Sequence, residues 1–97
     1  MKVFVTEKAR KDLVSIDDTE GDYLKRAVNQ LRSGYGLGNS RPVEGFENVF
    51  VLRSGNVRIY YMLKNDSSNA VIVGVETKKS AKKRRKSWVQ DRLTQAA

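Results

Sequence analysis

The sequence predicts an α+β domain in which two N-terminal helices pack on one face of a small, mostly antiparallel sheet. Apolar residues recur at helical spacing between residues 7 and 33, and β-rich segments alternate between residues 49 and 75. Ninety-seven residues are close to the common size of one folding unit. We therefore expect a single domain, with a core over residues 1–76 and a basic C-terminal segment and short helix over residues 77–97.

The first part of the chain predicts a strand and two helices. Residues 3–5 are a β-prone apolar run, and Thr6 is a suitable N-cap for the helix that follows. The apolar face of that helix is Ala9, Leu13 and Ile16, and residues 17–19 should end it. A second helix is expected to run to about Ser33, with Gly34 as its C-cap. Its apolar stripe is Leu24, Ala27, Val28 and Leu31.

Residues 34–48 contain four glycines and Pro42, which predicts a flexible loop. The Gly36 and Gly38 pair is not typical of a phosphate-binding loop, because no Gly-Lys-Ser/Thr follows it and no strand precedes it.

The second part predicts a β-hairpin followed by one more strand. Residues 49–53 and 57–64 flank a turn at Gly55 and Asn56, and this places Arg53 opposite Arg58. One face of the hairpin is then apolar and should receive the helices: Phe50, Leu52, Val57, Ile59, Tyr61 and Leu63. The other face carries Arg53, Arg58 and Tyr60. After a turn at residues 65–69, the alternation of Val71, Val73 and Val75 predicts the last strand.

Two directly opposed arginines are unfavourable in a sheet. One interpretation is that Arg58 pairs with a carboxylate such as Glu76 or Glu44. The interpretation that we favour is an anion held by two guanidinium forks, because Tyr60 lies beside the arginines and a basic segment follows the neighbouring strand.

The net charge of +8 is concentrated at the C-terminus. Residues 77–97 hold eight basic residues against Asp91 alone, while residues 1–76 hold 11 basic and 10 acidic residues. Such a field favours a polyanion, RNA before an anionic membrane surface. The chain has no cysteine and no histidine, so acid–base chemistry would fall to Lys, Arg, Tyr or a carboxylate. We expect no metal, no cofactor, no membrane span and a cytoplasmic protein.

The basic run consists of Lys78, Lys79, Lys82, Lys83, Arg84, Arg85 and Lys86. A helix could begin at Ser80, but lysines would then lie at the positive end of its dipole. The later start is favoured, with Ser87 and Gln90 as a capping box, or a helix whose first turns order on phosphate. Trp88 directly after the run indicates a docked segment, although a solvated tail and a nuclear localisation signal are ordinary alternatives.

Residues 52–61 (Leu-Arg, a turn, then Arg-Ile-Tyr-Tyr) resemble the RelE/ParE toxin superfamily. Residues 3–6 with Ala9, residues 11–13 and residues 42–45 match in the same order. Residues 75–80 are similar to the Lys-Lys-Ser/Thr segment of phage-type HigB members.

The resemblance implies a β-α-α-β-β-β core and an antitoxin partner. It also implies an endoribonuclease that cuts mRNA in the 30S decoding site, beside ribosomal RNA, by attack of a 2′-hydroxyl on the adjacent phosphate. The catalytic residues would be Arg58, Lys78, Lys79 and Arg53. The RNA-binding residues would be Tyr60, Lys82, Lys83, Arg84, Arg85, Lys86 and Trp88.

The chain departs from RelE at the positions of two lysines, and the C-terminal tyrosine of RelE has no clear counterpart here, since Trp88 could stack on a base but cannot transfer a proton. Val49 and Val51 stand where RelE has lysines, one of them the proposed base. Either Lys79, Lys82 or Lys83 substitutes, or cleavage is weak or absent. Two other functions therefore stay open: a ParE-like inhibitor of DNA gyrase, and a non-catalytic RNA- or ribosome-binding protein.

Overall fold

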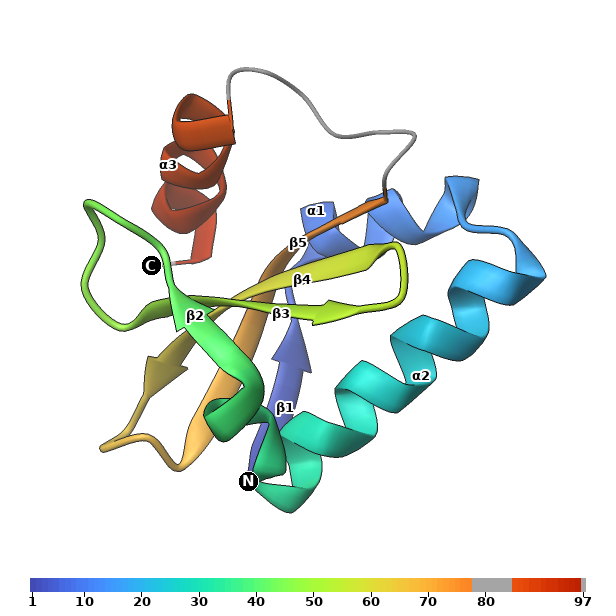
Figure 1. The fold of residues 1–97 in the computed structure, drawn as a ribbon. Coiled ribbons are helices and arrows are strands. Elements are labelled where there is room, and N and C mark those ends of the chain that lie inside the picture. Colours follow the sequence, from blue (N-terminus) through green and yellow to red (C-terminus); the bar gives the residue numbers. More distant parts are fainter. Residues whose placement is uncertain (78–84, 97) are drawn as a thin grey trace.

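The computed structural model describes residues 1–77 and 85–96. Its elements are β1 (Lys2–Val5), α1 (Glu7–Asp12), η1 (Leu13–Ser15), α2 (Asp18–Ser33), η2 (Tyr35–Asn39), β2 (Ser40–Pro42), β3 (Val49–Ser54), β4 (Val57–Lys64), β5 (Asn69–Thr77) and α3 (Arg85–Ala96). One five-stranded sheet has the order β1-β5-β4-β3-β2, in which β1 runs parallel to β5 and all other neighbours are antiparallel (Figure 1). The predicted α+β class is confirmed.

Local capping interactions set the boundaries of the first two helices. The Thr6 hydroxyl accepts a hydrogen bond from the Ala9 N–H (3.2 Å), which confirms the predicted cap. The first helix gives way to the 3-10 turn η1 earlier than its apolar spacing predicted. α2 begins inside the segment that was expected to be a break, because Asp17 and Glu20 form a reciprocal capping box. Gly34 ends α2 in the left-handed conformation (φ 86°).

The β3–β4 hairpin has the predicted register, with Arg53 opposite Arg58 and Leu52 opposite Ile59. The side chains on one face of the hairpin pack against α1 and α2. We call this cluster the first core; its buried residues are Ala9, Ala27, Leu31, Leu52, Val57, Ile59, Tyr61, Ala70, Ile72 and Val75. Burial of this apolar surface is the main stabilisation of the domain.

The prediction of a flexible loop over residues 34–48 was wrong for its first half, which contains η2 and β2. Ser40 to Pro42 form a fifth strand against β3. Two interactions hold this segment against the rest of the chain. Gly36 packs so closely on Leu31 that a Cβ at position 36 would lie 2.9 Å from the Leu31 side chain. The Tyr61 hydroxyl donates a hydrogen bond to the Ser40 hydroxyl (2.6 Å).

The opposite face of the sheet is not left open. α3 packs over it, and α2 and α3 lie on opposite sides of the ribbon in Figure 1. We call this cluster the second core; Val49, Tyr60, Val73 and Val89 are buried in it, with Trp88 and Leu93 packed against them. The side of the hairpin expected to display Tyr60 is therefore half covered, and Tyr60 is only 2% exposed.

α3 is anchored at its start by Trp88. The indole lies on Gly74, where a Cβ would approach it to 2.3 Å, so only glycine leaves room for the ring. α3 begins at Arg85, so the predicted capping box at Ser87 is wrong: Ser87 lies inside the helix. A capping-box pattern expresses a local preference, whereas the packing of Trp88 and Val89 on the sheet holds this helix.

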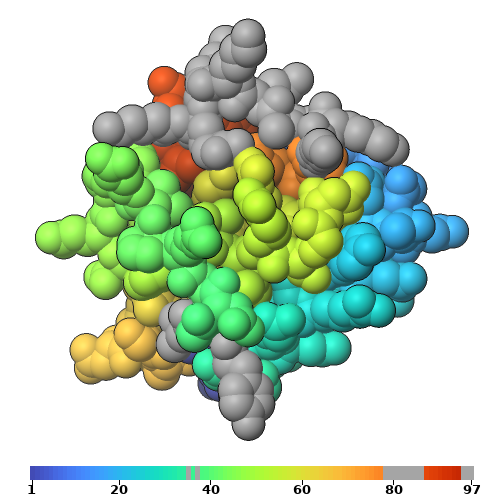
Figure 2. Space-filling view, viewed as in Figure 1, coloured from blue at the N-terminus to red at the C-terminus, as the bar shows by residue number. Residues whose placement is uncertain are grey.

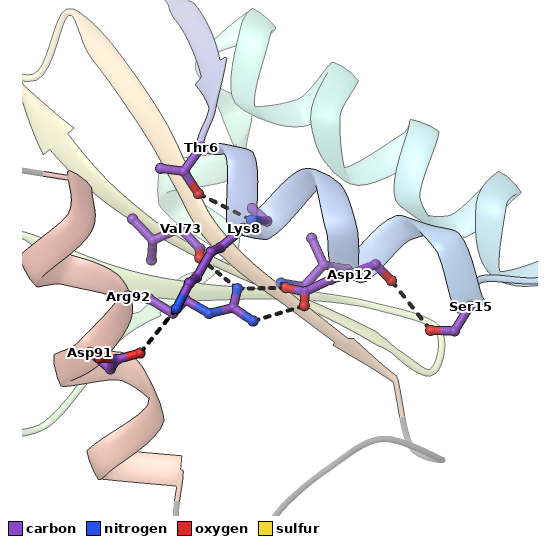
Figure 3. Close-up of polar contacts among 9 residues, drawn as sticks. Thr6, Lys8, Asp12, Ser15, Val73, Asp91 and Arg92 are labelled. Carbon is purple, nitrogen blue, oxygen red and sulfur yellow. Dashed lines mark hydrogen bonds and ion pairs between the residues drawn. The ribbon is translucent and has the colours of Figure 1, made fainter.

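A polar cluster ties α3 to α1 and β5 (Figure 3). Arg92 donates to both carboxylate oxygens of Asp12 (2.8 and 2.9 Å) and to the Val73 carbonyl (3.1 Å). Asp12 also accepts from the Val75 N–H (3.0 Å). Since β1 has ended beyond Ile72, these side chains satisfy backbone groups at the edge of β5.

Burial raises the pKa of the Tyr61 hydroxyl above its ordinary value, and the hydrogen bond with Ser40 opposes part of the shift. Because the pKa of Tyr61 is higher in the folded chain than the value of about 10 in the unfolded chain, the shift contributes to the stability of the fold below about pH 10. This contribution is lost as the pH rises through the pKa of the folded chain. We expect Tyr61→Phe to flatten the fall in stability above about pH 10. Urea unfolding of both proteins between pH 7 and 11 measures this, and parallel curves would contradict it.

Candidate functional site

The second face of the sheet carries a groove beside α3 that is rich in arginine. It has a cavity volume of about 450 Å³, within the ~300–1,000 Å³ of small-ligand pockets. We call it the arginine groove; its lining residues are Asn39, Arg41, Pro42, Val51, Arg53, Arg58 and Tyr60. All of these residues except Asn39, the last residue of η2, lie on β2 to β4, and in Figure 2 these strands (green to yellow) lie together on the visible face.

Strand pairing brings the three guanidinium groups together. Arg53 lies opposite Arg58, and Arg41 pairs with Val51, two residues before Arg53 on the same side of β3. Three positive side chains thus come from three neighbouring strands. Each guanidinium offers a planar fork of donors that matches the oxygens of a phosphate. The groove is therefore suited to an anion with several oxygens.

One carboxylate faces this positive group. Glu76 lies opposite Arg58 on β5, and its Oε1 is 3.4 Å from an Arg58 guanidinium nitrogen. The pairing with Glu76 that the sequence left open therefore exists. The same oxygen accepts a 2.7 Å hydrogen bond from the Tyr60 hydroxyl. Because the Arg58 contact is long and its side chain is 29% exposed, the pair does not close off the groove.

The structure brings some of the predicted site residues together. Arg53, Arg58 and Tyr60 line the groove, although Tyr60 offers it only a small edge. The Trp88 ring contacts the Tyr60 ring edge-on, with ring centres 5.3 Å apart. The Arg92 guanidinium lies over the Trp88 ring, 4.7 Å from the ring centre. Trp88 thus has a packing role, and the RNA-binding role expected for it remains a prediction.

The remaining predicted residues fall outside the described residues. They are Lys78, Lys79, Lys82, Lys83 and Arg84. Arg85 and Lys86 begin α3, but their side chains are not among those described.

Sequence reasoning missed Arg41 and Asn39, which lay in the segment interpreted as a loop. Their signal was weak, because a three-residue strand has no readable alternation. Gly74 did offer a signal, since an isolated glycine within a strand often marks a close approach or a bulge. Within residues 1–77 and 85–96, no cluster of acidic residues is arranged to hold a metal ion, and no helix could span a membrane.

Comparison with solved structures shows the fold. A chain of the RelBE toxin–antitoxin complex from Mycobacterium tuberculosis matches with 24% identity and a TM-score of 0.61, covering 79% of this chain and 96% of that one. The RelB–RelE complex from Methanococcus jannaschii gives 19% identity, a TM-score of 0.65 and coverages of 79% and 92%. The isolated RelE toxin of E. coli gives 16% identity, a TM-score of 0.61 and coverages of 95% and 97%.

No protein of curated function matches the chain. A family model does: that of the ParE toxin of the type II toxin–antitoxin system parDE, over residues 3–87. The match spans most of the chain and includes all five strands, of which β2, β3 and β4 line the arginine groove. The resemblance to the RelE/ParE superfamily is thereby confirmed, and this chain belongs to the ParE toxin family of type II toxin–antitoxin systems.

Proposed function

We propose that this toxin is an endoribonuclease that cuts mRNA in the decoding site of the small ribosomal subunit, in the cytoplasm. The observation that carries the proposal is the arginine groove, in which Arg41, Arg53 and Arg58 converge from three neighbouring strands. Single-stranded RNA presents phosphates and unstacked bases to such a surface. The groove also faces away from the first core, so a long strand has access to it.

The proposed reaction is attack of an RNA 2′-hydroxyl on its own 3′-phosphate. The O2′–P bond forms and the P–O5′ bond breaks, giving a 2′,3′-cyclic phosphate and a 5′-hydroxyl. Negative charge grows on the phosphate oxygens in the transition state. Arg58, with Arg53 beside it, would stabilise that charge by fixed hydrogen-bond donors. This part of the chemistry needs no histidine.

Proton transfer is assigned to the lysines after β5. Lys78 and Lys79 are the proposed acid–base groups, taking the proton of the 2′-hydroxyl and returning one to the leaving 5′-oxygen. Neither lysine of RelE has an equivalent in the described part of the groove. Val49 is buried in the second core and Val51 is half-buried at the edge of the groove.

A second candidate is inhibition of DNA gyrase without hydrolytic chemistry. It is favoured by the family model, which describes the ParE toxin, and by the two valines at the RelE lysine positions. The basic C-terminal segment is compatible with either target, because it is attracted to any polyanion.

Regulated expression in a bacterial host separates the two candidates. The ribonuclease should stop growth, halt protein synthesis and leave transcripts cut within codons, with 5′-hydroxyl ends at the cuts. Gyrase inhibition should instead induce DNA-damage signalling while translation continues. Intact transcripts together with a DNA-damage response would replace the first proposal by the second.

We further propose that an antitoxin protein neutralises this chain. The solved RelB–RelE structures that it resembles are toxin–antitoxin complexes, and a net charge of +8 favours an acidic partner.

A further inference from the structure

Among the described residues, two groups contact the same oxygen of Glu76. The Tyr60 hydroxyl is 2.7 Å from Oε1, a normal distance for an O–H···O bond, and Arg58 is 3.4 Å from the same atom. Glu76 is 5% exposed, so its carboxylate needs partners in place of water. The stronger of the two contacts therefore comes from the neutral hydroxyl.

A second arginine–carboxylate pair in this molecule shows how such a pair normally closes. Arg92 and Asp12 form two bonds of 2.8 and 2.9 Å, in the usual range of about 2.7–2.9 Å for charge-assisted bonds. Both pairs are partly buried, with side-chain exposures of 12% and 18% for Arg92 and Asp12 against 29% and 6% for Arg58 and Glu76. The Arg58 pair differs in that a hydroxyl already holds the oxygen that Arg58 contacts.

Sheet geometry and α3 hold that hydroxyl in place. Tyr60 pairs with Gly74 across the β4–β5 ladder, two residues from the Arg58–Glu76 pair and on the same side. The Trp88 ring, which lies on Gly74, contacts the Tyr60 ring edge-on. The aromatic contact restricts the Tyr60 ring, and its hydroxyl is thereby directed at Glu76.

Resting on the proposed function, we propose that Glu76 is an internal counter-anion that occupies Arg58 until an RNA phosphate displaces it, and that Tyr60 is the positioning residue that keeps this exchange easy. The Tyr60 hydroxyl prevents the Arg58–Glu76 pair from closing. It also remains on Glu76 when Arg58 turns to the phosphate, so the buried carboxylate keeps a donor. The ligand class is the phosphodiester of single-stranded RNA.

The exchange makes opposite predictions for the two partners. Tyr60→Phe keeps the ring packed on Trp88 but removes the hydroxyl that donates to Oε1, so Arg58 should move closer to Glu76 and RNA should bind about 3–10-fold more weakly. Glu76→Gln removes the competing charge and should strengthen binding by a similar factor. In the Glu76→Gln background, Tyr60→Phe should change affinity by less than about 2-fold, because no pair remains to close.

The experiment measures fluorescence anisotropy of a 2′-O-methyl oligoribonucleotide, which cannot be cleaved, with the full chain at several salt concentrations. Asp66→Asn is the matched control, since it removes one exposed carboxylate in the turn at the far end of β4. Asp66→Asn should change RNA affinity only as much as the loss of one negative charge anywhere on the surface would. Equal effects of Tyr60→Phe in both backgrounds, or weaker binding by Glu76→Gln, would overturn the proposal.

Two further measurements keep the outcome decisive. If Tyr60→Phe does not fold, the gain from Glu76→Gln should vanish in an Arg58→Ala background, and a persisting gain overturns the inference. If the unaltered chain does not bind the oligonucleotide, inorganic polyphosphate serves as the probe. The same pattern with polyphosphate keeps the exchange and rejects the RNA function; no binding of either rejects both.

Discussion

Replacing Arg58 by alanine is expected to slow mRNA cleavage on programmed ribosomes by about 10²–10³-fold, the usual loss when one fixed donor to transition-state charge is removed. Arg58 lines the arginine groove, and in the proposed reaction its planar fork would contact two oxygens of the attacked phosphate. Arg58→Lys keeps the charge without the fork and should lose about 10-fold. Single-turnover cleavage at saturating toxin measures the chemical step apart from binding.

Arg32→Ala is the control for this measurement. Arg32 is an exposed arginine in the last turn of α2, so the change lowers the net charge equally without altering the groove. Thermal melts of each variant establish that it is folded. Cleavage at the unaltered rate by a folded Arg58→Ala protein would remove Arg58 from the catalytic residues.

Replacing Asp12 by alanine is expected to lower the free energy of unfolding by about 2–4 kcal/mol, near the cost of breaking a buried ion pair. The change leaves the Arg92 guanidinium without its carboxylate and the Val75 N–H without its acceptor. For a domain of this size, the melting temperature should fall by about 4–8 °C for each kcal/mol. Urea unfolding and calorimetry measure both quantities.

Lys8→Ala is the matched control, because Lys8 and Asp91 form a second ion pair between α1 and α3 (Figure 3). This pair is 3.6 Å long and its side chains are 44% and 65% exposed. Exposed pairs of this kind contribute little because water and salt screen them. We expect a melting temperature close to that of the unaltered chain. Equal losses from Asp12→Ala and Lys8→Ala would mean that burial does not decide the strength of these contacts.

The β3–β4 hairpin and its register could be predicted because they depend on local chemistry. Gly55 adopts the left-handed conformation that the turn requires (φ 58°), and apolar residues alternate on both sides of it. The caps of the first two helices at Thr6 and Gly34 are equally local. Three short-range signals thus fixed the elements that build the first core and place Arg53 beside Arg58.

The parts that could not be predicted depend on contacts between residues far apart in the chain. β2 has only three residues, and it becomes a strand because β3 offers a free edge and Tyr61 binds Ser40. Arg41 therefore entered the groove unforeseen. The sequence also displayed Tyr60 on an open face, where α3 covers it in the folded chain.

By itself the sequence determined the α+β class, the opposed arginines and the basic C-terminal segment, because turns, periodicity and charge are properties of neighbouring residues. Only the tertiary structure decided how Glu76 is used. Strict alternation would put Val71, Val73 and Val75 on one face and Glu76 on the other. A bulge in β5 instead leaves Val73 without a partner on β4, so that Val75 joins the first core and Glu76 faces Arg58. The bulge forms where Trp88 packs on Gly74, a contact between β5 and α3 that no local pattern contains.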